Sequence, residues 1–238
     1  MTGCAGDERA RMGPDFFPLH TDDTWTYEVR HVLRNERTRM TVRVRDERYV
    51  EALGRRCRMV EETYATEASL SSIERPAAHP RAERYPVAYY HHGGYLFRSL
   101  AFEYRDNDLR PVGIGTSVER FLPDGLRTDL SWADESTAFD LGGGTGYVVR
   151  QTHWSRVEAE AVQVPAGEFR GCVRVDTVAV HGDKGEAPQV GIPVVLYYSD
   201  WYAPNVGLVR SVQRNRAGGG PPTAQVELLS FDVAGTHG

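Results

Sequence analysis

The sequence predicts an all-β protein, built as a curved antiparallel sheet or incomplete barrel of about a dozen strands. Apolar and polar residues alternate along most of the 238-residue chain, which is typical of strands with one buried face. Turns rich in Gly, Pro and Asn separate the alternating runs, and no run has the spacing of an amphipathic helix. These observations favour one curved sheet over a mixed fold.

The first half of the chain begins with an apolar segment, Phe16-Phe17-Pro18-Leu19, in which Pro18 opposes continuation of a helix. The strand patterns that follow are 25–33, 40–44, a short run 49–53 that stops at Gly54, 57–65, 87–90 and 95–104. Residues 67–86 are rich in Ser, Ala, Pro and Arg, so we expect a loop there, with a helical turn near 69–74.

The second half shows the same kind of pattern. Its strand patterns are a first strand at Trp132, then 147–154, 157–161, 172–180, 192–201, 206–214 and 225–233. Pro204-Asn205 predicts a turn between two of these strands, because Pro suits its second position and Asn tolerates the left-handed region at its third.

Landmarks recur in the two halves in the same order. Trp25 and Trp132 are one pair, and the tyrosine pairs at 89–90 and 197–198 are another, with all offsets between 105 and 115 residues. The other pairs are Phe17-Pro18 with Leu122-Pro123, Cys57 with Cys172, and Arg98-Ser99 with Arg210-Ser211. One interpretation is that each half repeats one strand meander; the alternative is coincidence between two alternating segments. We therefore predict a single domain over 15–238, with similar halves at 15–112 and 118–233.

Composition excludes several classes of function. The net charge is −5 and the arginines are spread among acidic residues, so no basic stripe for nucleic acid is present. No apolar run reaches about 18 residues, so no segment is predicted to span a membrane as a helix.

The first residues point to the bacterial cell envelope. Thr2-Gly3-Cys4 matches the end of a lipoprotein signal, whose cysteine receives lipid, and residues 1–14 have the composition of a tether. The charged and apolar segments of a signal peptide are not in this sequence, so its native start is left open. The alternative is a cytosolic protein with a chance cysteine at position 4.

The two remaining cysteines allow two interpretations. In an oxidising compartment Cys57 and Cys172 could form a disulfide that closes a long loop. The alternative is two small buried apolar side chains, the usual state of a free cysteine.

Three motifs carry a resemblance to a known family. They are Phe-Phe-Pro-Leu followed by Thr-Trp-Thr-Tyr near the start, Val-Pro-Ala-Gly-Glu-Phe at 164–169, and Trp-Tyr-Ala-Pro-Asn-Val-Gly-Leu-Val-Arg at 201–210. Residues 15–233 thereby resemble a family of uncharacterised bacterial envelope proteins, sometimes labelled TapB-like. The resemblance implies a secreted or lipid-anchored protein whose architecture is similar to the incomplete barrels of the lipoprotein-localisation carriers. The chain differs from those carriers in lacking clear helices, and the family supplies no catalytic residues.

Aromatic residues are the candidate binding residues. A curved sheet lined by them could hold an acyl chain or another apolar ligand, although they could equally form an ordinary core. The candidates are Tyr89, Tyr90, Tyr95, Tyr197, Tyr198 and Trp201. No catalytic residue, metal ligand or cofactor is predicted, because no nucleophile motif or zinc-like spacing is present and adjacent His91 and His92 would point to opposite faces.

The sequence therefore predicts a non-enzymatic, lipid-anchored envelope protein that acts as a binding or interaction module, with an apolar ligand as one candidate. A structural accessory that docks on an envelope protein complex is the first alternative, and a hydrolase is the second. The identity of the ligand or partner and the oligomeric state lie beyond the sequence.

Overall fold

The computed structural model describes residues 15–66, 83–99, 102–105, 108–111, 118–139, 146–183, 194–217 and 219–234. The strands of the main sheet are β1 (Thr24–His31), β2 (Glu36–Val50), β3 (Arg55–Thr66), β4 (Glu83–His92), β5 (Tyr95–Ser99), β8 (Val118–Pro123), β9 (Ser131–Phe139), β10 (Gly146–Val157), β13 (Val173–Asp183), β14 (Val194–Ala203), β15 (Gly207–Arg214) and β16 (Ala224–Asp232). Two small hairpins, β6 (Phe102–Arg105) with β7 (Asp108–Pro111) and β11 (Val162–Val164) with β12 (Gly167–Phe169), complete the strands. Two 3-10 turns, η2 (Val32–Arg34) and η3 (Glu51–Leu53), are the helical elements of these residues.

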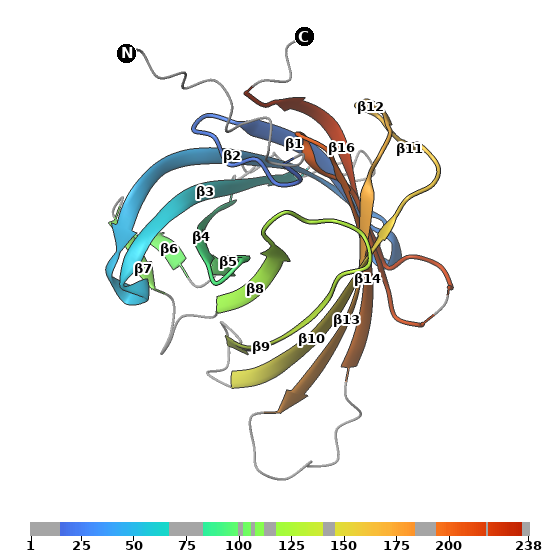
Figure 1. Ribbon diagram of the computed structural model, residues 1–238. Coiled ribbons are helices and arrows are strands. Elements are labelled where there is room, and N and C mark those ends of the chain that lie inside the picture. Colours follow the sequence, from blue (N-terminus) through green and yellow to red (C-terminus); the bar gives the residue numbers. More distant parts are fainter. Residues whose placement is uncertain are drawn as a thin grey trace, which may run out of the picture.

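The main sheet is an antiparallel meander that nearly closes on itself. Its order is β8-β5-β4-β3-β2-β1-β16-β15-β14-β13-β10-β9, so the pairing of β1 with β16 joins the two halves of the chain. The two edges are β8 and β9, which lie beside each other and form one unsealed seam. Figure 1 shows the strands wrapped around a common interior. The predicted class, an all-β incomplete barrel, is confirmed.

Contacts across the interior identify the inner face of each strand. Phe121 on β8 and Tyr202 on β14 are far apart in the sheet order, yet their ring centroids are 6.5 Å apart. Both side chains therefore point into the lumen. Since side chains alternate along a strand and directly paired residues share a face, the register assigns the remaining positions. Tyr27, for example, pairs with Met40, and Met40 pairs with Tyr64, so all three face inward.

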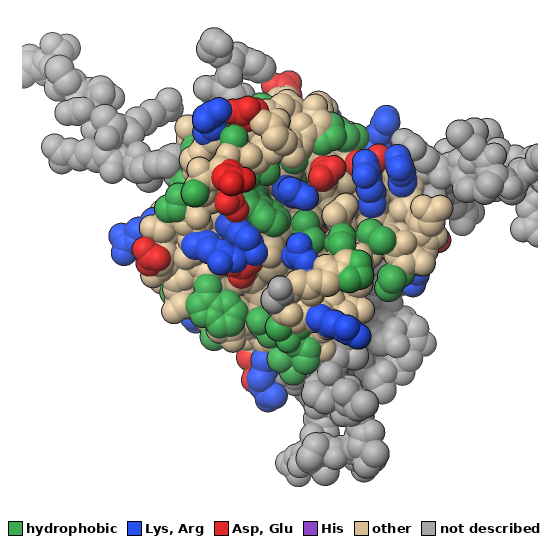
Figure 2. Space-filling view, turned by 90° about the vertical axis from the view of Figure 1, so that its right-hand side faces the viewer, with side chains coloured by type: hydrophobic (Ala, Val, Ile, Leu, Met, Phe, Trp, Pro, Cys, Tyr) green, Lys and Arg blue, Asp and Glu red, His purple; other side chains and the backbone are tan. Residues whose placement is uncertain are grey.

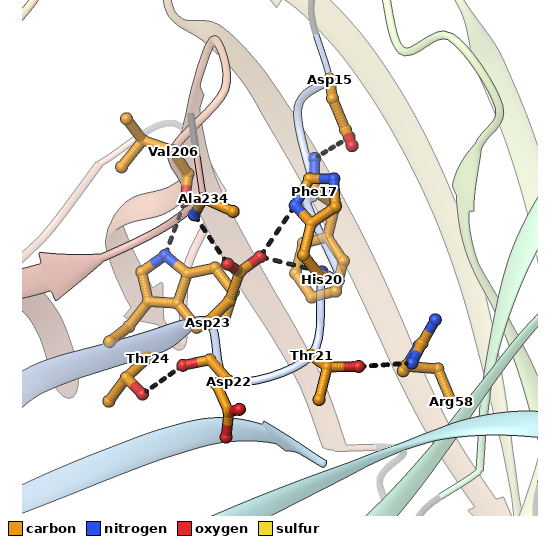
Figure 3. Close-up of polar contacts among 11 residues, drawn as sticks. Asp15, Phe17, His20, Thr21, Asp22, Asp23, Thr24, Arg58, Val206 and Ala234 are labelled. Atoms are coloured by element: carbon orange, nitrogen blue, oxygen red, sulfur yellow. Dashed lines mark hydrogen bonds and ion pairs between the residues drawn. The ribbon is translucent and has the colours of Figure 1, made fainter. Parts of the chain in front are cut away.

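One end of the barrel is packed by the N-terminal segment. Asn205 donates its backbone N–H to the carbonyl of Asp15 at 2.6 Å, and its side-chain oxygen accepts from the Asp15 N–H at 3.1 Å. The indole of Trp25 donates to the carbonyl of Val206 at 2.6 Å, as Figure 3 shows for this region. Buried Asp23 accepts from the backbone N–H groups of His20 and Ala234, at 2.9 and 2.8 Å. These bonds fix both ends of the described chain to the same end of the barrel, which we call the packed end.

The predicted turn at Pro204-Asn205 is confirmed, and its geometry explains the glycine that follows. Asn205 has φ of 60° and Gly207 has φ of 100°, both in the left-handed region. A Cβ on Gly207 would lie 3.7 Å from Pro18 and from the Trp25 indole. The turn is therefore part of the packed end and holds the N-terminal segment in place.

Two additions cover parts of the outer face. The η3 turn covers a second small core of Val50, Cys57, Met59 and Ala88, and β6 lies against β4. The β11–β12 hairpin lies beside β15 and β16, where the N–H of Ala166 bonds the carbonyl of Leu228 at 3.0 Å. Elsewhere the outer face mixes apolar, arginine and acidic side chains (Figure 2).

Some boundaries differ from the sequence prediction. The predicted short strand 49–53 is wrong, because Tyr49 and Val50 end the long β2 and 51–53 form η3. Residues 158–161 alternate in polarity but form no strand, since the chain there leaves the sheet between β10 and β11. The predicted run 95–104 is divided between β5 and β6. The helical turn expected at 69–74 and the tether 1–14 lie outside the described residues.

Most landmark pairs lie on corresponding strands when strands of the main sheet are counted from β1, which carries Trp25, and from β9, which carries Trp132. The tyrosine pairs then lie on the fourth strand and the Arg-Ser pairs on the fifth. One pair does not correspond, because Leu122-Pro123 lies on β8 whereas Phe17-Pro18 precedes β1. Cys57 lies on the third strand of its half, whereas Cys172 directly precedes the third strand of the other. An internal repeat of the fold stays a prediction.

Candidate functional site in the barrel lumen

Four aromatic rings close the lumen beneath the packed end. The ring centroids of Phe17 lie 5.3 Å from Tyr89 and 5.1 Å from Phe121, and Phe121 lies 5.8 Å from Tyr89. Tyr202 completes the group from β14, at 6.4 Å from Phe17. Such tilted and edge-to-face pairs are the favoured arrangements of aromatic rings. The group forms an apolar floor across the barrel.

A partly buried arginine lies directly beside this floor. Arg98 on β5 forms an ion pair with Glu119 on β8, and its guanidinium lies 4.5 Å from the centroid of the Phe121 ring. It is also hydrogen-bonded with Tyr89. Burial disfavours the charged form, but Glu119, Tyr89 and Glu62 outweigh it and raise the pKa of Arg98 above its ordinary value. A permanent positive charge is therefore fixed inside the barrel.

Further carboxylates surround this arginine. Glu62 on β3 accepts a hydrogen bond from the Tyr64 hydroxyl at 3.0 Å. Asp200 on β14 is hydrogen-bonded with Ser211 on the neighbouring strand. Burial raises the pKa of Asp200 to about 6, although Ser211 and Arg98 both favour its charged form. The carboxyl group of Asp200 thus titrates near neutral pH.

A histidine completes the polar lining on the other side of the seam between β8 and β9. The ring of His153 on β10 stacks on Trp132 of β9, with centroids 4.8 Å apart and an interplanar angle of 13°. Its Nδ1 lies 2.8 Å from the hydroxyl oxygen of Thr177. Burial, and the charge of Arg98, lower the pKa of His153 to about 4, so the ring is neutral at pH 7. Its Nε2 and the indole nitrogen of Trp132 are buried and have no partner among the described residues.

Tyrosines supply most of the remaining surface around the cluster. Burial raises the pKa of five of these phenols, so they stay neutral and act as apolar surface with a polar end. They are Tyr27, Tyr64, Tyr89, Tyr198 and Tyr202.

Solvent still reaches part of this interior. Arg98 exposes 26% of its side chain and Glu119 exposes 12%. Tyr198 and Asp200 are likewise only partly buried, although burial is the main cause of their raised pKa values. The cluster therefore combines charged groups with partial exposure to solvent.

The structure divides the predicted binding residues between the two faces. Tyr89 and Tyr198 face the lumen. Tyr90, Tyr95, Tyr197 and Trp201 face outward by the strand register. Tyr90 stacks on Phe97 at 5.3 Å, and Trp201 lies between the guanidinium groups of Arg174 and Arg210 and donates to Glu158 at 2.7 Å. Two of the six candidates therefore belong to the lumen.

Sequence reasoning missed the charged members of the site. Arg98, Glu119, Asp200 and His153 were not singled out, because a charged residue in an alternating run is normally assigned to the solvent face. A signal was present for Asp200, which follows Tyr198 by two positions and so shares its face.

The predicted disulfide is not formed. Cys57 and Cys172 are both buried free thiols, and they belong to different hydrophobic clusters. Burial raises the pKa of each thiol to about 11, so neither is reactive at neutral pH. The structure supports the second interpretation, two small buried side chains. Cys4 lies outside the described residues.

The histidine and the titrating carboxylate of the lumen are not arranged as two members of a catalytic triad. His153 is paired with Thr177, whereas Asp200 is paired with Ser211, so the histidine and the carboxylate belong to separate hydrogen-bonded pairs. Within the described ranges, no three His, Cys, Asp or Glu side chains are grouped to hold a metal ion. His91 bonds Asp124 at 2.6 Å, and His92 lies against Phe97 instead. No described helix is long and apolar enough to cross a membrane.

Comparisons with known proteins identify the fold. No family model and no curated protein matches the chain, so the TapB-like label stays a prediction. The structure of a proposed lipoprotein from Parabacteroides distasonis ATCC 8503 aligns with a TM-score of 0.56 and 15% identity, over 93% of this chain and 100% of that one. A proposed exported protein with a YmcC-like fold, from Bacteroides fragilis NCTC 9343, aligns with a TM-score of 0.54 and 15% identity, over 92% and 99% of the two chains. The chain is thus similar in fold to these two proteins over nearly its whole length.

Proposed function

We propose that this chain is a cell-envelope protein whose barrel lumen binds a small amphipathic molecule. The observation that carries the proposal is the cluster of charged side chains around Arg98, which lies beside an aromatic floor and is partly exposed to solvent. An apolar ligand part would replace water on the partly exposed lumen rings, such as those of Tyr64, Phe121 and Tyr198, at roughly 25 cal/mol per Å² of apolar area buried. A polar group of the ligand would hydrogen-bond the charged side chains of the cluster. A purely apolar ligand would exclude water from these side chains without offering them a hydrogen bond.

The envelope assignment rests on independent support. Thr2-Gly3-Cys4 has the order of a lipoprotein processing site, and the two structures of similar fold are described as a proposed lipoprotein and a proposed exported protein. We expect the native protein, expressed with its own leader, to incorporate a labelled fatty acid on Cys4. A Cys4→Ala variant should take up no label, and equal labelling of both would contradict the anchor.

A non-enzymatic role agrees with the lumen chemistry. General acid–base or nucleophilic catalysis needs a base within hydrogen-bond reach of a nucleophile. His153 lies within hydrogen-bond reach of the Thr177 hydroxyl, but burial lowers the pKa of its ring to about 4, which makes it a weak base. Its other ring nitrogen has no carboxylate partner among the described residues. Binding is therefore better supported than hydrolysis.

A docking role is the alternative, and one observation favours it. Trp154 on the outer face of β10 is 45% exposed, next to the edge strand β9. Exposed aromatic side chains of this kind are frequent in protein interfaces. If the lumen binds nothing, this surface becomes the better starting point.

Two adjacent tyrosines provide a matched test of lumen binding. Tyr198 faces the lumen and Tyr197 faces outward. Calorimetric titration with dodecylamine, dodecanol and dodecanoate, each below its micelle concentration, should detect binding of at least one. Replacing the inner ring should weaken that binding by about tenfold, since the ring contributes on the order of 1–3 kcal/mol of apolar contact. We expect this of Tyr198→Ala and no change for Tyr197→Ala. Absence of binding by all three probes, or equal effects of the two substitutions, would contradict lumen binding.

A further inference from the structure

Two hairpins of the barrel end in the same kind of turn but use their apolar residues differently. Both η2 and η3 are three-residue 3-10 turns that end on a left-handed residue, Asn35 with φ of 50° and Gly54 with φ of 63°. In η3 the apolar side chain of Leu53 packs onto the small core around Cys57 and Met59. In η2 no residue is buried, and Val32 and Leu33 are 44% and 77% exposed. The fold therefore explains the apolar residue of η3 and leaves those of η2 without a structural role.

Arginines surround this exposed apolar tip. The tip is tied to the loop between β15 and β16, because Val32 donates its N–H to the carbonyl of Thr223 at 3.0 Å. Residues 28–37 and 214–223 together contain five arginines and two glutamates, a net charge of +3 in a chain whose total is −5. Arg30 and Arg37 share Glu28 as their ion-pair partner, whereas Arg34 and Arg216 extend the positive charge at exposed positions. Figure 2 views the side to which the β15–β16 loop projects in Figure 1 and shows arginine and apolar side chains there, with acidic side chains among them.

The position of the tip fits a surface contact. The turns after β1 and β15 lie at the end of the barrel opposite to the packed end, because successive strands are antiparallel. Nothing described at this end covers Leu33. Two exposed apolar side chains among guanidinium groups are the pattern of an element that rests in the interfacial region of a membrane, where arginine meets anionic headgroups and the apolar residues enter the acyl boundary.

We propose that the η2 hairpin, residues 28–37 with the adjoining loop 214–223, docks on a membrane surface that carries anionic phospholipid. A protein partner is less favoured, because a stable protein interface buries about 1,200–2,000 Å² and a convex two-residue tip supplies only a small part of that area. A lipid surface needs no complementary shape, and its negative charge matches the local charge of the hairpin. The contact goes beyond the lumen site and the lipid on Cys4, since it uses neither.

Vesicle sedimentation of the whole chain carrying Cys4→Ser, which excludes any lipid anchor, tests the proposal. The protein should bind vesicles made of equal parts phosphatidylglycerol and phosphatidylcholine, should bind phosphatidylcholine alone only weakly, and should lose binding as salt rises. Arg34→Gln should lower the partition coefficient about fivefold. Leu33→Ser should lower it roughly tenfold. Both positions are exposed, so thermal unfolding should stay unchanged.

The matched control is Tyr49→Ser, which removes a 59% exposed side chain at the η3 end of the barrel. It should leave vesicle binding unchanged. The proposal would be overturned if the protein bound both kinds of vesicle equally, or if Leu33→Ser and Arg34→Gln left binding unchanged. An acidic protein surface would then be the better partner for the same charges. Lumen binding of the dodecyl probes would be unaffected by that outcome, so the two proposals fail separately.

Discussion

The two halves of the barrel place the same short motifs on corresponding strands but on opposite faces. In the first half Tyr89 and Arg98 point into the lumen. Their counterparts in the second half, Tyr197 and Arg210, point outward, while Tyr198 faces inward instead. A shift of one residue in strand register is sufficient to exchange the faces of a whole strand. Similar sequence order in two half-barrels therefore does not imply similar chemistry in the lumen.

The exchange of faces makes the lumen asymmetric. The first half contributes a permanent cation, Arg98, together with Glu62, and Arg98 forms its ion pair with Glu119 on β8. The second half contributes Asp200, which titrates near pH 6, and the neutral His153. The corresponding arginine of the second half, Arg210, has its partners on the outer face. Its guanidinium lies 5.4 Å from the centroid of the outward-facing Trp201 ring, and its Nε lies 3.8 Å from Glu227. One arginine is part of the lumen and the other is part of the outer surface.

The largest predicted loss of unfolding free energy is for a substitution of Arg98, and the same substitution of Arg210 should have a much smaller effect. Arg98→Gln removes the cation that compensates Glu119 and Glu62 and leaves buried carboxylates without a partner. Breaking a buried pair in this way costs about 3–5 kcal/mol, and partial solvent access lowers our expectation to about 2–4 kcal/mol of unfolding free energy. Urea unfolding monitored by circular dichroism measures it.

The control is Arg210→Gln, which removes a partly exposed ion pair and a contact with an indole ring. Such surface contacts contribute about 1 kcal/mol or less. If both substitutions lower the unfolding midpoint equally, Arg98 is not a buried charge and the proposed asymmetry of the lumen is wrong.

The fold class could be predicted from the sequence because a strand with one buried face imposes a period of two. That period located β1 at Trp25 and β13 after Cys172, and the Pro204-Asn205 turn followed from the dihedral preferences of these two residues. Alternation of apolar and polar residues predicts strands wrongly where the apolar residues are not part of the main sheet. Residues 158–161 alternate in a connecting segment, and Leu53 is apolar because it packs onto an outer core.

The lumen was harder to predict because alternation separates two faces without saying which one is inside. Tyr89 and Tyr90 are neighbouring residues of the same type, so the sequence does not show which of them faces the lumen. Their ring contacts in the folded protein do, because Tyr89 lies against Phe121 and Tyr90 stacks on Phe97. The outer face is also buried in places, as at Cys57, so burial alone does not mark the lumen. Arg98 and Glu119 meet through the pairing of β5 with β8, which depends on the omission of β6 and β7 from the main sheet. Such pairings are properties of the three-dimensional fold.

A smaller effect is predicted for the pH dependence of stability, to which Asp200 of the second half contributes. An unfolded aspartate has a pKa of about 3.9, whereas burial raises the pKa of Asp200 to about 6 in the folded protein. Between these values the folded state keeps a proton that the unfolded state has released. The contribution of this group to stability is therefore present below about pH 4 and is lost as the pH rises through 6. A difference of about two pKa units corresponds to roughly 3 kcal/mol, which partial solvent access reduces to about 2 kcal/mol.

Asp200→Asn removes this titration while keeping a side chain that can bond Ser211. We expect the unfolding free energy of the variant, relative to the wild type, to rise by about 2 kcal/mol between pH 4 and pH 7. The variant has to be compared with the wild type at each pH, because His153 adds a second pH dependence to the stability of both proteins. The lowered pKa of His153 makes both of them lose stability as the pH falls from about 6.5 to 4, which is opposite to the effect of Asp200. Glu135→Gln is the control, since Glu135 is 60% exposed and pairs with Arg150 on the outer face. Parallel profiles for Asp200→Asn and the wild type would show that Asp200 keeps the ordinary acidity of a solvated carboxylate, and the second half would then bring no titrating group into the lumen.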